Sequence, residues 1–171
     1  MYRFIVLFLV IVSVLFIAEL TPPVQNAVVL PFTAAVTHVS AAIMQLFDDQ
    51  VRAQGKVIWD QTSGFAVSIE AGCNGVEAGI ILFAAMFAFP ASWQQKLIGI
   101  LVGLVTVQAL NLIRIISLFY IGQWNQTLFE WAHLYVWQAL IMLDVLLVFL
   151  FWLRWISLRS ASSRAAPGAP A

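Results

Sequence analysis

The chain has 171 residues, of which 63% are hydrophobic and only 9% are charged. Soluble domains are about half apolar and about a quarter charged, so this composition excludes an ordinary soluble protein and indicates an integral membrane protein. Lys and Arg balance Asp and Glu at eight each, and the sequence has no basic patch of the kind that binds nucleic acid. Cys73 is the single cysteine, which excludes a structural disulfide within the chain and a four-thiolate metal site.

Four apolar segments are candidates for transmembrane helices, because a span needs roughly 20 mainly apolar residues. In chain order they cover residues 4–20, 76–89, 97–121 and 135–153. We interpret the first as an uncleaved anchor, because only Arg3 precedes it and Ala18-Glu19-Leu20 is a poor signal-peptidase site. The second is short for a span unless it extends into its flanking residues.

The sequence between the first two predicted spans is less apolar than the spans themselves. Residues 28–47 contain Pro, Thr, His, Ser and Gln, which predicts an amphipathic helix at the membrane interface rather than a span. Residues 56–60 and 65–70 are β-prone runs around a polar, Gly-containing turn, which predicts a short β-hairpin. We therefore expect residues 1–155 to form one membrane-embedded domain. Residues 156–171, rich in Ser, Ala, Pro and Arg, are expected to be a disordered cytoplasmic tail.

The positions of the basic residues predict how the chain is oriented. With four spans and a cytoplasmic N-terminus, the cytoplasmic basic residues are Arg3, Lys96, Arg154, Arg159 and Arg164. A fifth span at residues 28–47 would place one of the two basic ends on the wrong side. The predicted fold class is therefore an all-α integral membrane protein with about four transmembrane helices. Its amphipathic helix and β-hairpin are expected on the extracytoplasmic side.

Three chemically distinctive residues are predicted to reach one depth near the outer face. Cys73, Arg114 and His133 each lie roughly 26–32 Å of helix from the cytoplasmic end of their own span, at about 1.5 Å per residue. Three side chains at one level on neighbouring helices are the arrangement that a catalytic or binding site requires.

Cys73 has two interpretations. A lone cysteine in a membrane protein is commonly a small buried hydrophobic residue. Here, however, Asn74 is a candidate N-cap and Glu77 follows it by three residues, which resembles a capping box. Cys73 would then stand at a helix N-terminus, where the helix dipole favours the thiolate.

The other charged or titratable residues of the later spans also have alternative roles. Arg114 is flanked by apolar residues on both sides in the sequence. It therefore either snorkels to the outer headgroups or serves a site by stabilising an oxyanion or binding a carboxylate. His133 is either an interfacial bystander or the base that activates a thiol, and Glu130 either orients its imidazole or favours a helix start. Asp144 lies deep in the fourth span, must be paired or neutral there, and is assigned no role.

Three motifs in this order resemble the exosortase/archaeosortase family. They are Cys73-Asn74-Gly75 after a β-like stretch, Asn111 through Arg114-Ile115 within a later span, and His133 at the start of the next. The amino-acid sequence of residues 70–78 and 133–138 resembles that of the compact exosortase H subgroup. The chain departs from the wider family by being short and by having Asn74 where many members have Ser.

The resemblance implies a cysteine protease-transpeptidase of the bacterial cytoplasmic (inner) membrane, with its active site on the extracytoplasmic side. It implies Cys73, Arg114 and His133 as catalytic residues, with Asn74, Asn111 and Glu130 supporting them or binding substrate, and neither metal nor cofactor. The expected partners, besides the lipid bilayer, are exported proteins with a C-terminal signal made of a short motif, a transmembrane helix and a basic cluster. For the H subgroup the motif is of the Ile-Pro-Thr-Leu type. The acceptor, whether water, a lipid or a glycan, stays open.

Two other classes of function remain open at this point. One is a non-catalytic membrane scaffold, and the other is a small transporter subunit that binds an anion through Arg114. A thiol oxidoreductase is disfavoured, because a single cysteine has no resolving partner. Convergence of Cys73, Arg114 and His133 would favour catalysis, whereas residues lining a continuous path through the membrane would favour transport.

Overall fold

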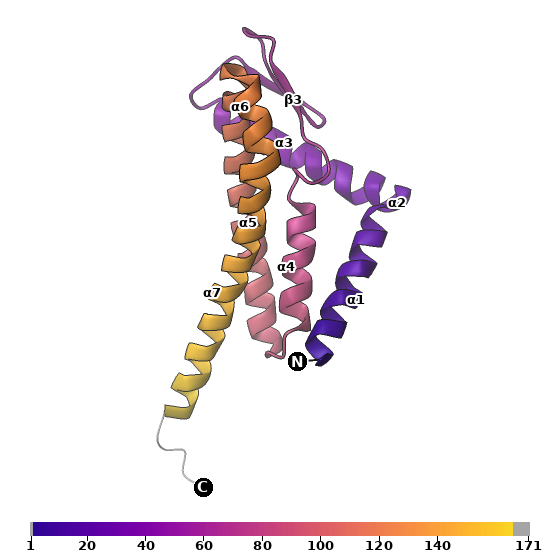
Figure 1. Cartoon of the computed structure of the whole chain (residues 1–171), viewed down its shortest axis with the longest axis vertical. Helices are drawn as coiled ribbons and strands as arrows, with labels where there is room; N and C mark the ends of the chain where they lie inside the picture. Colours follow the sequence, from indigo (N-terminus) through magenta and orange to yellow (C-terminus); the bar gives the residue numbers. More distant parts are fainter. Residues whose placement is uncertain (1, 166–171) are drawn as a thin grey trace.

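The computed structural model describes residues 2–165, with side chains described as far as Arg159. Its main body is a bundle of four helices that run side by side (Figure 1). These are α1 (Tyr2–Glu19), α4 (Val76–Ala88), α5 (Trp93–Trp124) and α7 (Trp137–Ala165). Helix α4 is central, because it packs against α1, α5 and α7. The four helices of the bundle correspond to the four segments predicted as spans.

Length and hydropathy select a slightly different set of four candidate spans. They are Tyr2–Glu19, Pro22–Met44, Trp93–Trp124 and Gln126–Arg159, whereas Val76–Ala88 is a shorter apolar helix. The predicted number is confirmed, but its membership differs at the second position. In Figure 1 the helix that ends at Met44 lies across the upper end of the bundle, while α4 runs along it. Position in the bundle therefore separates the two better than composition does.

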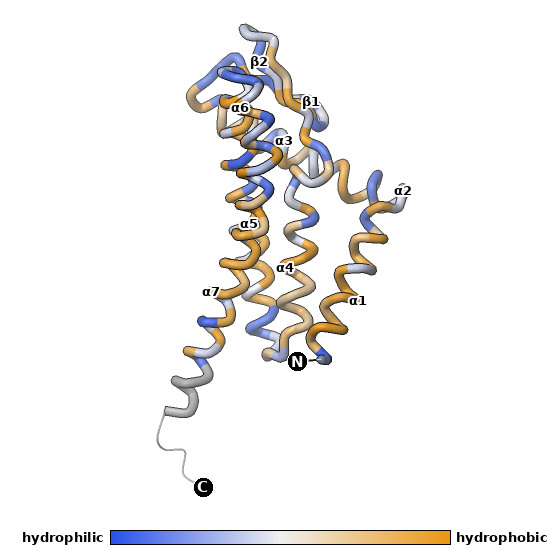
Figure 2. The backbone as a smooth tube through the Cα atoms, in the orientation of Figure 1, coloured by the Kyte–Doolittle hydropathy of each residue, from blue (hydrophilic) through white to orange (hydrophobic). Residues whose placement is uncertain are grey.

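The outer surface of the bundle is apolar, as expected of helices that face lipid. Only 6% of the first candidate span is buried inside the protein, although it is the most hydrophobic of the four. Figure 2 shows hydrophobic residues along the middle of the helices and hydrophilic residues toward their ends and in the sheet. Such a surface stays out of water only in a bilayer, so the fold belongs to an integral membrane protein.

The helix across the end of the bundle consists of α2 (Pro22–Val24), the π-helical turn η1 (Gln25–Val29) and α3 (Leu30–Met44). Its polar residues face inward: the buried hydroxyls of Thr33, Thr37 and Ser40 each donate to the carbonyl four residues earlier. This local bonding is what allows them to be buried. Large apolar residues of the same helix are exposed, so its polarity is the reverse of that predicted for an interfacial helix with its polar side in water.

A small antiparallel sheet covers the same end, with strand order β1-β2-β3. Its strands are β1 (Val51–Gln54), β2 (Val57–Asp60) and β3 (Ala66–Ser68). The predicted hairpin corresponds to β2 and β3, so its strands were found but the sheet was incomplete. Strand β1 was missed because three of its four residues are Arg, Ala and Gln, which lack a β-prone pattern.

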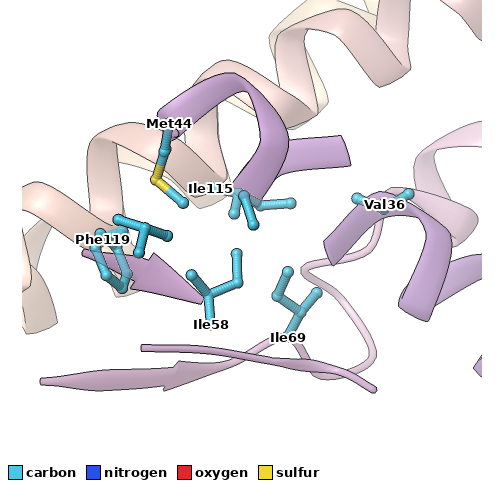
Figure 3. Packing of buried hydrophobic residues seen from close by; sticks show 8 residues of the cluster. Val36, Met44, Ile58, Ile69, Ile115 and Phe119 are labelled. Carbon is cyan, nitrogen blue, oxygen red and sulfur yellow. The ribbon is translucent and has the colours of Figure 1, made fainter. Parts of the chain in front are cut away.

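One hydrophobic cluster fixes the sheet to the helices (Figure 3). Its labelled members come from α3, the sheet region and α5: Val36, Met44, Ile58, Ile69, Ile115 and Phe119. The Phe65 ring, just before β3, packs edge-on against Phe119 with centroids 5.7 Å apart. The cluster therefore holds the segment that follows β3 against α5, and this segment carries Cys73.

The two longest helices reach beyond the hydrocarbon core. Helix α5 begins at a Ser92–Gln95 capping box and has 32 residues, about 48 Å of helix against a core of about 30 Å. The segments α6 (Gln126–Trp131) and the π-helical turn η2 (Ala132–Val136) continue into α7. Helix α7 extends to Ala165, so residues 156–165, part of the segment 156–171 predicted to be disordered, are helical. Residues 166–171 lie outside the described part of the chain.

The fold predicts that the sheet and the far end of α7 lie on opposite sides of the membrane. In Figure 1 the N-terminal end of α1 and the far end of α7 lie at one end of the bundle, and the sheet lies at the other. Alkaline phosphatase fused after Asp49 should be active, while the same reporter fused after Arg159 should be inactive. A green fluorescent protein fusion at each position provides the complementary signal. The two positions reporting the same side would contradict this topology.

Candidate active site

The loop that carries Cys73 connects β3 to α4 and is shaped by two glycines. Gly72 and Gly75 have φ values of +81° and +80°, a region that residues with a Cβ rarely adopt. A Cβ on Gly75 would also lie 2.6 Å from Gln108 Nε2 on α5. The turn on both sides of Cys73 is therefore tight, and Gly75 lets it pack directly on α5.

Asn74 anchors this loop to the helix that crosses the bundle. Its side chain is 1% exposed, and its Nδ2 donates to Thr33 Oγ1 on α3 at 3.0 Å. Its Oδ1 accepts from the backbone N–H of Val76 at 3.0 Å. The predicted N-cap is thus shifted: Gly75 is the N-cap residue of α4, and Asn74 bonds the first helical N–H from one position earlier.

Glu77 closes the loop from the other side. Its Oε1 accepts from the backbone N–H of Gly72, and not from Asn74 as a capping box would require. Its Oε2 is buried and has no hydrogen-bond partner among the described residues. Sequence reasoning did not identify this role, because the bond runs five residues backward across a glycine turn rather than three.

Arg114 points into the protein toward Cys73. Its side chain is 2% exposed, its Nη1 donates to the Gly72 carbonyl at 3.1 Å, and its Nη2 lies 3.5 Å from Cys73 Sγ. Its Nε has no partner in the described part of the chain. Snorkelling to the headgroups does not describe this geometry, because the guanidinium is enclosed by protein.

No carboxylate neutralises Arg114. Among residues 2–159, the ion pair that the structure contains joins Lys56 to Glu70, on the exposed sheet surface. Withdrawing a lone cation from water costs several kcal/mol, and such cations are retained where an anion compensates them. Nη2 of Arg114 contacts the Cys73 sulfur, and the carboxylate of Glu77 binds the same loop at Gly72 without an ion pair to Arg114.

Asn111 lies one helical turn before Arg114 on α5 and packs against the loop that carries Cys73. It is 1% exposed, its Nδ2 is 3.5 Å from Gln108 Oε1, and its Oδ1 has no partner among the described residues. A Cβ on Gly75 would be 3.1 Å from Asn111 Nδ2. Asn111 therefore contacts the Cys73 loop rather than the thiol.

His133 completes the group from the start of the last helix. It lies in η2, where the N–H of Trp137 donates to the Ala132 carbonyl, five residues back. Single π turns of this kind are common at functional sites because they re-aim a side chain. His133 Nε2 is 3.9 Å from Cys73 Sγ, and the imidazole stacks on Phe129 with centroids 5.7 Å apart.

Glu130 does not reach His133. It is exposed and accepts from Gln126 Nε2 at 3.3 Å, while His133 Nδ1 has no partner among the described residues. The packing of Phe129, which sequence reasoning did not single out, orients the imidazole instead. Asp144 is half-buried in α7 and lines none of the cavities described below.

Cys73, Arg114 and His133 therefore converge, as the depth argument predicts. They share the wall of a cavity of about 360 Å³ at the sheet end of the bundle. Its other walls come from the segment 65–71, from Ile115 and Leu118 on α5, and from Gln126 and Phe129. Within the described part of the chain, no group of three or more His, Cys, Asp or Glu residues is placed to hold a metal ion.

The electrostatics of the thiol differ from the expectation based on a helix N-terminus. Burial raises the pKa of the Cys73 thiol, the Arg114 guanidinium opposes this, and the carboxylates of Glu77 and Glu70 add to the rise. The helix N-terminus is a weaker influence because Gly75, and not Cys73, is the N-cap. In the resting protein the thiol is therefore less ionised at neutral pH than an ordinary cysteine.

The comparison with known families matches most of the chain. The family model described as transmembrane exosortase (Exosortase_EpsH) matches residues 1–152, which include every element of the fold up to the last turns of α7. The chain belongs to the transmembrane exosortase family. No curated protein and no solved structure matches it.

Membership in the transmembrane exosortase family confirms the resemblance read from the three motifs. It also agrees with a multi-pass membrane protein built from four candidate spans and a small sheet. The geometry brings Cys73, Arg114 and His133 together, and it adds Glu77, Thr33 and Phe129 to the candidate residues. The glycines flanking Cys73 were the sequence signal that could have indicated so tight a loop.

The clamp formed by Glu77 predicts a graded effect of substitution. Glu77→Ala leaves the Gly72 N–H without its charged acceptor, which should lower the free energy of unfolding by about 1.5–3 kcal/mol. Glu77→Gln keeps an acceptor oxygen and should lose less. Thermal unfolding in detergent measures both, and alkylation of Cys73 should accelerate in Glu77→Ala as the loop loosens. Equal losses in the two variants would show that the carboxylate charge, and not the hydrogen bond, stabilises the loop.

The raised pKa of Cys73 predicts the pH profile of its alkylation. Because only the thiolate reacts, the midpoint should lie above the value of about 8.5 of an ordinary thiol. Glu70→Gln should move the midpoint down by removing a negative charge, and Arg114→Ala should move it up by removing the positive one. Iodoacetamide labelling of the purified protein between pH 6 and pH 11 gives the profile, with a free thiol as the reference. A midpoint below the reference would contradict this description of the site.

Proposed function

We propose that the protein is a membrane cysteine protease-transpeptidase with Cys73 as nucleophile, His133 as general base and acid, and Arg114 as oxyanion stabiliser. The observation that carries this proposal is the buried guanidinium of Arg114, which has no carboxylate partner and lies 3.5 Å from the Cys73 sulfur. A site of this kind is prepared for negative charge that appears during a reaction.

The first half of the reaction forms a thioester. His133 Nε2 takes the proton of the Cys73 thiol as Sγ attacks the carbonyl carbon of the scissile peptide bond. The separation of 3.9 Å in the free protein shortens to a hydrogen bond when substrate enters, as is common for catalytic pairs. The carbonyl oxygen becomes an oxyanion, which the unpartnered Nε and the Nη2 of Arg114 are positioned to bind.

The second half transfers the acyl group. The tetrahedral intermediate collapses, the C–N bond breaks, and His133 returns its proton to the leaving amine. An acceptor nucleophile then attacks the thioester carbonyl, and His133 takes the proton of that acceptor while the C–S bond breaks and the thiolate is reprotonated. Atoms and charge balance in each half with Cys73 and His133 alone, and Arg114 changes neither its protonation nor its bonds.

The raised pKa of the resting thiol fits this sequence of events. A buried, protonated cysteine is protected from unselective oxidation and alkylation, since these reactions need the thiolate. Substrate binding supplies the interactions that make proton transfer to His133 favourable. Binding energy then acts on the reacting state rather than on the resting protein.

The substrates that fit this proposal are exported proteins held in the same membrane. Family membership and the position of the cavity at the end opposite the N-terminus support a substrate whose cleavage point lies outside the cytoplasm. A C-terminal signal of a short motif, a transmembrane helix and a basic cluster satisfies this requirement, and the motif proposed for this chain is of the Ile-Pro-Thr-Leu type.

The alternative functions lack a comparable observation. A transporter needs a path through the bundle, but the cavity around Arg114 shares no lining residue with the apolar cavity of about 370 Å³ between α5 and α7. A scaffold requires no convergence of a thiol, an imidazole and a buried guanidinium.

Processing of a tagged substrate tests the proposal. Co-expression with an exported protein that carries the Ile-Pro-Thr-Leu-type signal should yield a shortened, released or transferred product on immunoblots. Cys73→Ala should abolish the product. Arg114→Lys keeps the charge but loses the forked donors, and should reduce the rate by about 100- to 1,000-fold.

His133→Ala and Glu130→Ala form a matched pair for the same assay. The first should abolish processing, because His133 Nε2, 3.9 Å from the sulfur, is the group that takes the thiol proton in this mechanism. The second should process normally, because Glu130 is exposed and bonds only Gln126 among the described residues. Processing by Cys73→Ala at the wild-type rate would overturn the assignment of the nucleophile.

A further inference from the structure

Strand β3 has one edge that pairs with no other strand in the described part of the chain. It pairs with β2 on one side only, because the strand order is β1-β2-β3. The N–H of Asp60 donates to the carbonyl of Phe65, and the N–H of Ile69 donates to that of Lys56. In an antiparallel pair, bonded and non-bonded residue pairs alternate. The backbone N–H and C=O groups of Phe65, Val67 and Ile69 therefore point toward β2. Those of Ala66 and Ser68 point away from the sheet.

The opposite edge of the sheet, formed by β1, has hydrogen-bond partners outside the sheet. On β1, the outward carbonyl of Val51 accepts from Gln45 Nε2 at 2.8 Å, and its N–H lies 3.5 Å from the Asp48 carbonyl. The end of α3 thus covers that edge at Val51, while the outward backbone groups of Ala53 have no hydrogen-bond partner among the described residues. No such bond reaches the backbone of Ala66 or Ser68 from any described residue. An exposed edge of this kind is a template for another strand.

The free edge of β3 runs along the cavity of the candidate active site. Seven consecutive residues, 65–71, line that cavity, although side chains of a strand alternate between its two faces. A cavity beside one face would contact every second residue and would also contact β2. Among the described residues, none from β1 or β2 lines it. The cavity therefore lies beside the edge, and it continues from there to Cys73, Arg114 and His133.

We propose that the segment of substrate around the scissile bond binds in an extended conformation as a fourth strand, hydrogen-bonded to the free edge of β3. This inference rests on the proposed function and specifies how the substrate is held. Main-chain bonds to Ala66 and Ser68 supply affinity that is independent of sequence and fix the register of the peptide. The chain leads from Ser68 through the short segment 69–72 to Cys73, so the added strand passes the thiol within a few residues.

The two sides of the added strand meet different surfaces. Substrate side chains that point inward face Ile115, Leu118 and Phe129, which form an apolar wall of the cavity. The side chains between them face outward, near Ser68 and the Lys56–Glu70 ion pair. A strand has a period of two, so the preferred substrate alternates an apolar residue with a small or polar one. A proline is accepted where its nitrogen points away from β3.

Proline substitution tests the main-chain bonds. Ala66→Pro removes an N–H that points to the cavity and leaves the bonds between β2 and β3 intact. With the tagged Ile-Pro-Thr-Leu-type substrate and purified protein in detergent, KM should rise about tenfold, since one lost hydrogen bond of about 1.4 kcal/mol is a factor of ten. Ser68→Pro should have the same effect at the second position.

Two variants serve as matched controls. Ala53→Pro makes the same change on β1, where the N–H also points away from the sheet but not into the cavity, and should leave KM unchanged. Ala66→Val adds bulk at the test position but keeps the N–H, and should raise KM much less than Ala66→Pro does. Iodoacetamide labelling of Cys73 at an unchanged rate shows that each variant retains the folded site. Equal effects of Ala66→Pro and Ala53→Pro, or of Ala66→Pro and Ala66→Val, would overturn the proposal.

Cross-linking tests the same arrangement without turnover. In a Cys73→Ala background, Ser68→Cys should form disulfides with single cysteines placed at alternate positions of the substrate signal. Gln54→Cys, exposed on β1, should form none. Cross-linking at consecutive positions, or equally from both sites, would overturn the added strand. Because this experiment needs no cleavage, it separates the two proposals. Failure of the wild-type protein to process the substrate counts against the proposed function, and an absent period of two counts against the mode of binding.

Discussion

The buried guanidinium of Arg114 is the constraint on which the rest of the structure depends. A cation this deeply enclosed, with no carboxylate beside it, is stable only if several elements hold its hydrogen bonds in place. The Gly72 carbonyl supplies one acceptor, and this carbonyl is positioned by Glu77 on one side and by the Asn74–Thr33 bond on the other. Helices α3, α4 and α5 are thus tied together around one positive charge, and Nη2 of Arg114 lies 3.5 Å from the Cys73 sulfur.

The sheet makes this arrangement possible by fixing the loop from above. The hydrophobic cluster packs against β2 and against the segment after β3, and it joins both to α3 and α5. The chain therefore enters the Gly72–Gly75 turn at a defined position. The π turn at His133 has the corresponding effect on the last helix, because it shifts the imidazole toward the sulfur while Phe129 stacks on it. Each of these side chains is therefore positioned by a different local structure, and all three line one cavity.

Much of this could be predicted from sequence, and the failures have identifiable causes. Apolar length located the bundle, and counting along helices placed Cys73, Arg114 and His133 at one level, because a helix has a fixed rise. Sequence could not reveal that α3 turns its Thr and Ser residues inward, since hydroxyls bonded to their own helix look polar in composition yet can be buried. The role of Glu77 and the raised pKa of Cys73 depend on a backward hydrogen bond and on burial, which are properties of the folded loop. Strand β1 was missed because pairing, rather than its own residues, makes it a strand.

In the proposed enzyme, the shortness of α4 limits which molecules can reach the thiol. Its 13 residues give about 20 Å of helix, about 10 Å less than the hydrocarbon core, so with its lower end at the cytoplasmic boundary the loop above it starts inside the core. A free peptide would have to leave water and bring its unpaired amides to that depth, which is unfavourable by several kcal/mol for each unsatisfied group. A chain already anchored in the same bilayer holds the residues next to its anchor at that depth throughout its lifetime. In the proposed protease, a site at this depth would select peptide bonds by their distance from a membrane anchor before any side chain is recognised.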